Sequence, residues 1–218
     1  DSENRLVGII TIDDILDIIE EENEEDFAKM NALAPSDEEY LDSSVYSLAK
    51  QRIMWLLILM ISATFTGIII RQYESVLSSV VILASFIPML MDTGGNSGSQ
   101  SSTLIIRGLA LGELEIADYP KILWKEFRVS IVVGLVLAFI NFLRIYLLER
   151  VDFIVSLTVC ISLFATVVLA KVVGGMLPLI AKKFKLDPAI MAARLVTTIV
   201  YTFALIVYFS AASLLMGL

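Results

Sequence analysis

Apolar residues dominate the chain after residue 52, where they form long segments separated by short polar connections. These segments cover residues 53–70, 76–91 with a continuation to about 110, 122–148, 153–180 and 189–218. Each can supply the roughly 20 residues that cross a hydrocarbon core about 30 Å thick. Backbone polar groups in lipid need partners within the same segment, which favours helices. The pattern therefore predicts an all-α integral membrane protein with five transmembrane helices.

The first 50 residues follow a different pattern. Fifteen of the 24 acidic residues lie between residues 1 and 42, against two basic ones, Arg5 and Lys29. Residues 5–11 are typical of a strand and residues 12–30 of a helix, and Pro35 interrupts the polar linker that follows. A composition change this sharp marks a domain boundary. We therefore divide the chain into residues 1–11, the expected end of a longer preceding domain, an acidic helix with its linker at 12–50, and a membrane domain at 51–218.

The composition argues against several classes of function. The chain has no His, which excludes His-based catalysis and ordinary zinc sites, and its single Cys160 excludes an internal disulfide. No nucleophile–base set and no nucleotide-binding loop are recognisable, so we expect the protein not to be an enzyme. A mean hydropathy of +0.82 makes the lipid bilayer the expected environment. We expect neither a nucleic-acid partner nor a small-molecule substrate.

Basic residues in the short connections predict the orientation, because cytoplasmic loops carry an excess of Lys and Arg. One side of the predicted bundle holds Lys50, Arg52, Arg107, Lys121, Lys125, Arg128, Lys182, Lys183 and Lys185, and the other holds Arg71, Arg144 and Arg150. The first side is therefore predicted to be cytoplasmic. This puts the N-terminus in the cytoplasm and the C-terminus outside a plasma (inner) membrane.

A polar stretch, MDTGGNSGSQSSTLIIRG at residues 91–108, interrupts the second apolar segment. Small residues here can let helices pack closely. Alternatively, the Gly94–Gly95 pair can form an unwound turn, which is tolerated at membrane depth where it lines water. Asp92, with Asn96 and Gln100 nearby, favours the second interpretation, because a membrane-buried carboxylate normally faces a cavity or a partner. Both interpretations stay open.

The acidic helix is a candidate cation sensor. Asp14, Asp17, Glu21 and Glu25 fall in one stripe at 100° per residue. Like charges three or four residues apart destabilise a helix, so this crowding calls for counter-cations. Oxygen ligands alone suit Mg²⁺, Ca²⁺ or Mn²⁺. The alternative is a solvated acidic linker.

Three motifs resemble the MgtE family of magnesium channels. They are PMLMDTGGNSGSQSSTLIIRGLA, GGMLPLIAKKFKLDPA at residues 174–189, and LVGIITIDDILDIIEEE near the N-terminus. The last is similar to the end of that family's CBS region and its plug helix. The resemblance implies a homodimer with a pore on the two-fold axis, lined by the second and fifth helices. It also implies Mg²⁺ influx that stops when cytosolic Mg²⁺ binds the acidic cytoplasmic region.

The resemblance also implies roles for particular residues. The implied pore-lining residues are Asp92, Gly94, Gly95, Asn96, Gln100, Arg194, Thr197 and Tyr201. The implied Mg²⁺ ligands are Asp14, Asp17, Glu22, Glu25, Asp26 and Asp187. The last of these is implied to bridge to the plug helix through Mg²⁺. It is also a natural N-cap for a helix that has Pro188 at its first position.

The chain departs from the family pattern in the fifth helix. Arg194 stands where the family usually has Pro, and Tyr201 where it has the pore Asp. A fixed positive charge in a narrow pore opposes a divalent cation, so one alternative is a family member with altered selectivity or low conductance. Arg194 can instead pair locally with Asp92 or Asp187, and Lys171 has a similar choice between pairing and facing the pore. A third alternative, from another class, is a non-conducting Mg²⁺ sensor or scaffold.

Overall fold

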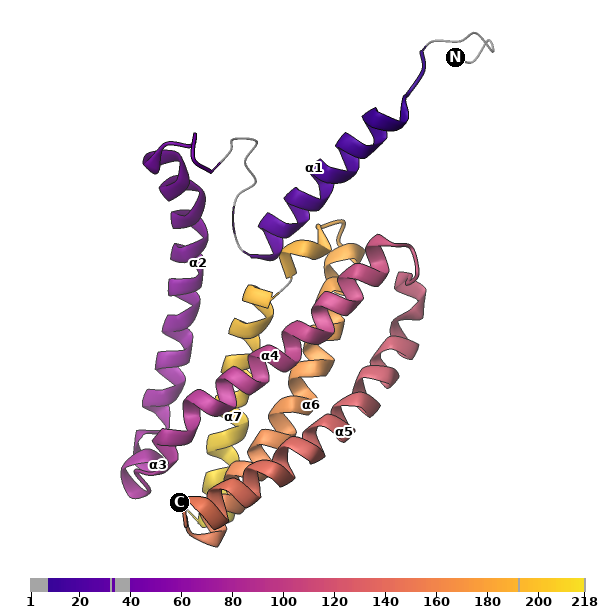
Figure 1. Ribbon diagram of the computed structural model, residues 1–218. Helices are drawn as coiled ribbons and strands as arrows, with labels where there is room; N and C mark the ends of the chain where they lie inside the picture. Colours follow the sequence, from indigo (N-terminus) through magenta and orange to yellow (C-terminus); the bar gives the residue numbers. More distant parts are fainter. Residues whose placement is uncertain (1–7, 32, 34–39, 192, 218) are drawn as a thin grey trace.

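The computed structural model describes residues 8–31, 33, 40–191 and 193–217, and it is helical with no strand in those ranges (Figure 1). The α-helices are α1 (Ile12–Met30), α2 (Val45–Gln72), α3 (Glu74–Ser79), α4 (Leu83–Ala110), α5 (Tyr119–Leu143), α6 (Phe153–Lys183) and α7 (Ala193–Met216). Shorter turns are the 3₁₀ segments η1 (Ile116–Asp118) and η3 (Pro188–Met191) and the π-helical η2 (Arg144–Leu148). Residues 5–7 of the predicted strand lie outside the described residues, and residues 8–11 form no strand, so the strand prediction is wrong over those four residues, where Thr11 caps α1 instead.

Among the described residues, four helices are long and apolar enough to cross a membrane. They are Val45–Gln72, Ile116–Leu148, Phe153–Lys183 and Leu195–Met216. The described residues confirm the helical fold, and these four helices are consistent with the predicted integral membrane protein, while a fifth span stays a prediction. The helix of the predicted second span, α4, is not among these four. Its 28 residues include many Gly, Ser and amide residues, which lower its hydropathy.

That second segment also begins differently from the prediction. A helix was expected from residue 76, but α3 ends at Ser79 and α4 begins at Leu83. The Ser78 and Ser79 hydroxyls both donate to the Ser75 carbonyl, at 3.0 and 2.8 Å. Such side-chain bonds to the backbone compete with the helical ladder and favour its end here.

The core of the bundle is built around α6. This helix packs against α4, α5 and α7, and α4 also packs against α7 along its length. The crossing of α4 and α6 is very close, since a Cβ at Gly174 would collide with the Gly98 backbone. Near the other end of α4, the buried Tyr208 hydroxyl donates to the Leu83 carbonyl at 2.9 Å. These contacts fix the depth and rotation of α4.

Two helices are only loosely attached to this bundle. α2 stands at one side and contacts mainly α7, and none of its residues is buried (Figure 1). α1 extends away from the end of the bundle opposite the C-terminus, and only its last turns approach η3 (Figure 1). The exposed apolar side chains of α2 need lipid or another chain to cover them.

Candidate functional site

α4 remains helical through the glycine motif, from Leu83 to Ala110. The prediction of an unwound turn at Gly94 and Gly95 is therefore wrong. The glycines allow close packing instead, because their ideal Cβ positions lie 2.7–2.8 Å from Thr166 for Gly94, Tyr201 for Gly95 and Val196 for Gly98. These neighbours belong to α6 and α7, so small residues bring three helices together here, as in other membrane bundles.

The carboxylate and the two amides of the motif lie on the other side of α4. Asp92, Asn96 and Gln100 are exposed and recur every four residues, which places them on one helical face. Thr103 and Arg107, also exposed, continue this face toward the end of the helix that is near α1. We call this set the polar stripe. A membrane helix with a carboxylate and two amides on its surface needs water or a partner chain opposite that surface.

α7 borders the polar stripe through Tyr201 and Thr197. Measured from the ideal Cβ position of Gly95, Cε1 of Tyr201 lies at 2.8 Å and Cγ2 of Thr197 at 3.0 Å. Three of the predicted pore residues therefore meet at one point, although Gly95 precedes Thr197 and Tyr201 by about 100 residues in the sequence. The Arg194 side chain lies outside the described part of the structure, so its predicted place on the pore face stays a prediction.

Two charged residues inside the bundle were not assigned a site from the sequence. Ser101, 1% exposed, donates to Oε2 of Glu126 on α5 at 2.5 Å, and Glu126 also lies against Gly175 of α6. One turn earlier on α6, Lys171 is 5% exposed and has no ion pair with any described residue. For both residues, the sequence feature that could have indicated a buried polar site was a charge within an apolar segment. Glu126 was not singled out from the sequence because it lies among the basic residues at 121–128.

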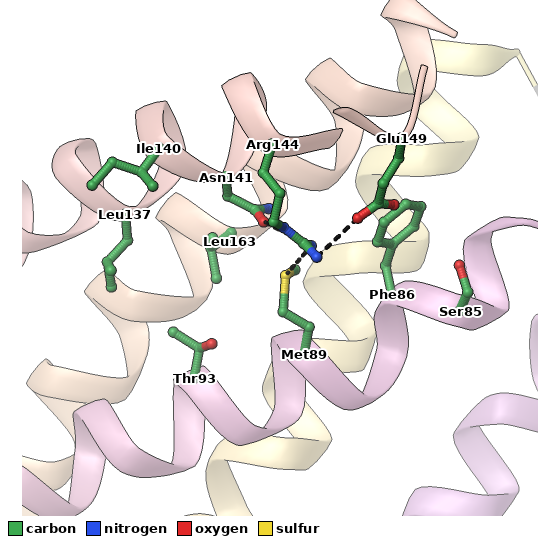
Figure 2. A pocket seen from close by; sticks show the side chains of 10 residues that line it. All are labelled: Ser85, Phe86, Met89, Thr93, Leu137, Ile140, Asn141, Arg144, Glu149 and Leu163. Atoms are coloured by element: carbon green, nitrogen blue, oxygen red, sulfur yellow. Dashed lines mark hydrogen bonds and ion pairs between the residues drawn. The ribbon is translucent and has the colours of Figure 1, made fainter. Parts of the chain in front are cut away.

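A second polar cluster lies toward the opposite end of α4 from Arg107, in a cavity of about 420 Å³ between α4, α5 and α6 (Figure 2). Figure 2 shows the Arg144 side chain reaching across this cavity. Its guanidinium lies 2.9 Å from Oε1 of Glu149, donates to Oδ1 of Asn141 at 3.0 and 3.1 Å, and approaches the Met89 sulfur at 3.5 Å. Through Asn141 and Met89, the Arg144 guanidinium links α5 to α4. Glu149 balances the positive charge of Arg144.

The predicted cation ligands on α1 do not all lie together. Asp14 sits in the first turn, where its Oδ2 accepts from the Thr11 N–H at 2.8 Å and from the Thr11 hydroxyl at 2.6 Å. This capping box begins the helix and holds the pKa of Asp14 below its usual value. Asp17 and Glu22 are exposed farther along. These three carboxylates lie away from the bundle.

The last turns of α1 bring the remaining predicted ligands together at the loop before η3. Lys29 Nζ lies 2.5 Å from Oε1 of Glu25 and 2.6 Å from Oδ2 of Asp187. The other oxygen of Asp187 accepts from the Ala189 N–H at 2.8 Å, which confirms its predicted N-cap role. Asp26 and Asp187 both line a cavity of about 160 Å³, which Lys182 also borders.

The electrostatics of this cavity favour a cation. Burial and the nearby Asp187 charge raise the pKa of Asp26. Burial acts on Asp187 in the same direction, but hydrogen bonds from Lys29 and Ala189 outweigh it and hold the pKa of Asp187 low. The hydrogen bonds with Asp187 and Glu25 raise the pKa of Lys29. The Lys29 ammonium therefore pairs with Glu25 and Asp187, while Asp26 lies beside Asp187 at a cavity that Lys182 also borders.

The donor set fits a hydrated cation better than a fully protein-ligated one. Within the described ranges, no group of three or more Asp, Glu, His or Cys side chains is placed to hold a metal ion. Mg²⁺ commonly binds through one or two carboxylates and keeps several of its waters. Asp26 and Asp187 offer that number of carboxylates at a cavity with room for water.

Comparisons with known proteins bear on both regions. The family described as MgtE, divalent cation transporter, matches residues 87–211, a range that includes the polar stripe, α6 and most of α7. Over 99% of its length, the chain is 39% identical to the magnesium transporter MgtE of Thermus thermophilus, of which it covers 48%. It is 34% identical to that of Bacillus subtilis over 96% of this chain and 46% of the relative. It is 27% identical to the magnesium transporter MgtE of Enterococcus faecalis, over 99% of this chain and 47% of the relative.

The chain thus spans about half the length of the curated relatives it matches. Within that half, the similarity runs through α1 and the whole helical bundle. It therefore agrees with the resemblance carried by the glycine motif and by the α6–α7 connection. On the family match and on these identities, the chain belongs to the MgtE family of divalent cation transporters.

Proposed function

We propose that this chain forms the membrane part of a Mg²⁺ channel or transporter, with α4 as a fifth membrane span and the polar stripe along the ion pathway. The observation that carries the proposal is the exposure of Asp92, Asn96 and Gln100 on one face of a helix whose other face is locked into the bundle. Oxygen-bearing side chains can replace part of the hydration shell of Mg²⁺ or bind its waters. Three relatives named as magnesium transporters support the choice of ion.

The pathway is proposed to lie between two copies of the chain. A single chain leaves the polar stripe uncovered, and its carboxylate at membrane depth needs an aqueous or protein neighbour. A two-fold axis beside α4 and α7 would face the two stripes toward each other and enclose a polar channel. It would also line the channel with Thr197 and Tyr201 from both chains.

The proposed direction of transport is influx, with α1 in the cytoplasm. The ends of the helices near α1 carry Arg107, Lys121, Lys182 and Lys183, which is the distribution expected at a cytoplasmic face. The C-terminus lies at the opposite end of the bundle and is proposed to be extracytoplasmic (Figure 1).

Gating is proposed to occur where α1 meets the loop before η3. Mg²⁺ at the Asp26–Asp187 cavity, holding some of its waters, would fix the end of α1 over the cytoplasmic end of the bundle. Charge supports this, because burial first and then the charge of Asp187 raise the pKa of Asp26, and a divalent cation would relieve the repulsion between the two carboxylates. Asp14, Asp17 and Glu22 remain proposed ligands for further ions that α1 shares with other parts of the protein.

Flux through proteoliposomes containing a Mg²⁺-sensitive dye tests the transport proposal. Asn96→Leu should lower Mg²⁺ influx at least about tenfold, which corresponds to a loss of about 1.4 kcal/mol in the stabilisation of the ion at the polar stripe. The matched control is Thr64→Val on α2, where an equally exposed polar side chain bonds only to the Met60 carbonyl of its own helix. Equal influx through both variants and the unmodified chain would exclude the stripe as the pathway.

A non-conducting sensor is the second candidate function. The neutral phenol of Tyr201, packed against Gly95, favours it, because it stands where the family resemblance implies a pore carboxylate. A sensor would give no Mg²⁺ influx in the same vesicles, yet α1 would still be protected from proteases as Mg²⁺ is added. Measurable influx that Asn96→Leu abolishes would rule this candidate out.

A further inference from the structure

Lys29 connects the acidic helix to the membrane bundle through two ion pairs. Its ammonium lies between Glu25, one turn earlier on α1, and Asp187, which is 158 residues away in sequence. The side chain is partly buried, with 22% of its surface exposed. Since α1 approaches the bundle mainly at η3, the pair with Asp187 is the principal polar link between the two parts.

We propose that Lys29 is a built-in counter-cation, which keeps α1 docked without a divalent ion and competes with Mg²⁺ for the carboxylates at this contact. The proposal rests on the gating function proposed above and adds a competitor to it. The same Asp187 carboxylate that would help to hold Mg²⁺ is already bound by the ammonium. An incoming ion must therefore displace Lys29 from Asp187 or share the carboxylate with it.

The charges at the contact explain why both cations have a role. Glu25, Asp26 and Asp187 supply three negative charges, and Lys29, together with Lys182 at the edge of the same cavity, balances two of them. The ammonium bonds to Glu25 and Asp187 but not to Asp26, whose pKa is raised in part by the charge of Asp187. The remaining negative charge attracts a divalent ion, while the ammonium weakens that attraction. Lys29 would thus set the Mg²⁺ concentration at which the contact tightens.

A local helix-stabilising role does not account for this geometry. An i, i+4 pair such as Glu25–Lys29 needs only α1, and it is found on many exposed helices. Lys121 provides the comparison within this chain, since its ammonium at the start of α5 pairs only locally among the described residues, with Asp118 at the end of the adjoining η1 turn at 2.8 Å. Lys29 differs because its ammonium binds Glu25 on its own helix and also Asp187 in the membrane bundle.

Limited proteolysis of the linker at residues 31–44 in reconstituted protein tests the proposal, with Mg²⁺ titrated from an EDTA baseline. Lys29→Met should raise the cleavage rate in EDTA at least threefold, because the link to Asp187 is lost. The same variant should lower the Mg²⁺ concentration for half-maximal protection at least threefold, because the competitor is gone. Lys29→Arg should keep both values within twofold of the unmodified chain, and Lys121→Met should change neither.

These two effects have opposite signs, which separates competition from simple damage to α1. An unfolded or misplaced α1 would raise cleavage at every Mg²⁺ concentration. If Lys29→Met leaves either value unchanged, or raises the Mg²⁺ requirement, the proposal is wrong. If the unmodified chain shows no protection by Mg²⁺ at all, the proposed gating fails, and the EDTA baseline alone still decides whether Lys29 docks α1.

Discussion

Replacing Gly174 with Ala perturbs the crossing of α4 and α6 on which the position of the polar stripe depends. The added Cβ would lie closer to the Gly98 carbonyl oxygen than any van der Waals contact permits, and its distance to the Gly98 Cα would be 2.9 Å. Both obstacles are backbone atoms, so the helices must separate. Overpacking of this kind costs about 1–3 kcal/mol, and more where backbone must move.

Gly175 provides a matched control on the same helix. A Cβ there would meet only the Glu126 side chain, with Cγ at 3.2 Å, and this flexible chain can shift. Both substitutions gain the same helix propensity, about 0.5–1 kcal/mol for Gly to Ala. The difference between the two variants therefore isolates the collision, and we expect it to be at least about 2 kcal/mol.

Thermal unfolding of the purified protein in detergent measures this difference. Gly174→Ala should melt at least about 4 °C below Gly175→Ala, since 1 kcal/mol corresponds to about 2–4 °C in a chain of this size. Gly67→Ala on α2, where nothing lies within 4 Å, should melt at or above the unmodified chain. Equal melting of the Gly174 and Gly175 variants would refute the close crossing and, with it, the fixed rotation of α4.

Three further tests, which use four substitutions, address other parts of the structure. Tyr208→Phe removes the hydrogen bond to the Leu83 carbonyl and should cost about 1 kcal/mol of stability, measured by the same unfolding assay. Lys171→Met should raise the melting temperature, because it removes a buried ammonium that has no ion-pair partner among the described residues. A lower melting temperature would mean that Lys171 has a partner in the assembled protein. Arg194→Pro combined with Tyr201→Asp should raise Mg²⁺ flux in proteoliposomes, with Tyr201→Asp alone giving a smaller gain; no gain from the double variant would mean that Arg194 points away from the pathway or is neutralised locally.

Long apolar segments made most of the fold predictable. The predicted helix at residues 12–30 coincides with α1, and the segment predicted at 153–180 begins where α6 begins. These boundaries follow from local features, such as the Thr11 capping box and the Asp152 side chain that accepts from the Ile154 N–H. The break between α3 and α4 was missed because it depends on serine hydroxyls within an otherwise apolar segment, and hydropathy does not register them.

The candidate site was less predictable, because its contacts join distant residues. No spacing rule links Lys29 to Asp187 or Ser101 to Glu126, and the sequence gives no measure of how closely two helices approach. The resemblance implied that Asp187 lies near the acidic helix, but Lys29 was noted only as one of two basic residues in an acidic region. Its role emerges only when α1 and the loop before η3 are seen together.

The glycines of the motif and its carboxylate and amide side chains lie on different faces of one helix. Gly94 and Gly98 are four residues apart and must face α6 and α7, because only a glycine fits there. At 100° per residue, Asp92, Asn96 and Gln100 then face away from those helices. Close packing therefore orients the polar side chains, and a side chain larger than hydrogen at either glycine would turn or displace the stripe.

For this reason, the substitution at Gly174, which touches no polar residue, should also reduce Mg²⁺ flux if the stripe forms the pathway. Normal flux through a Gly174→Ala protein that is demonstrably destabilised would separate the packing of α4 from its proposed role in transport.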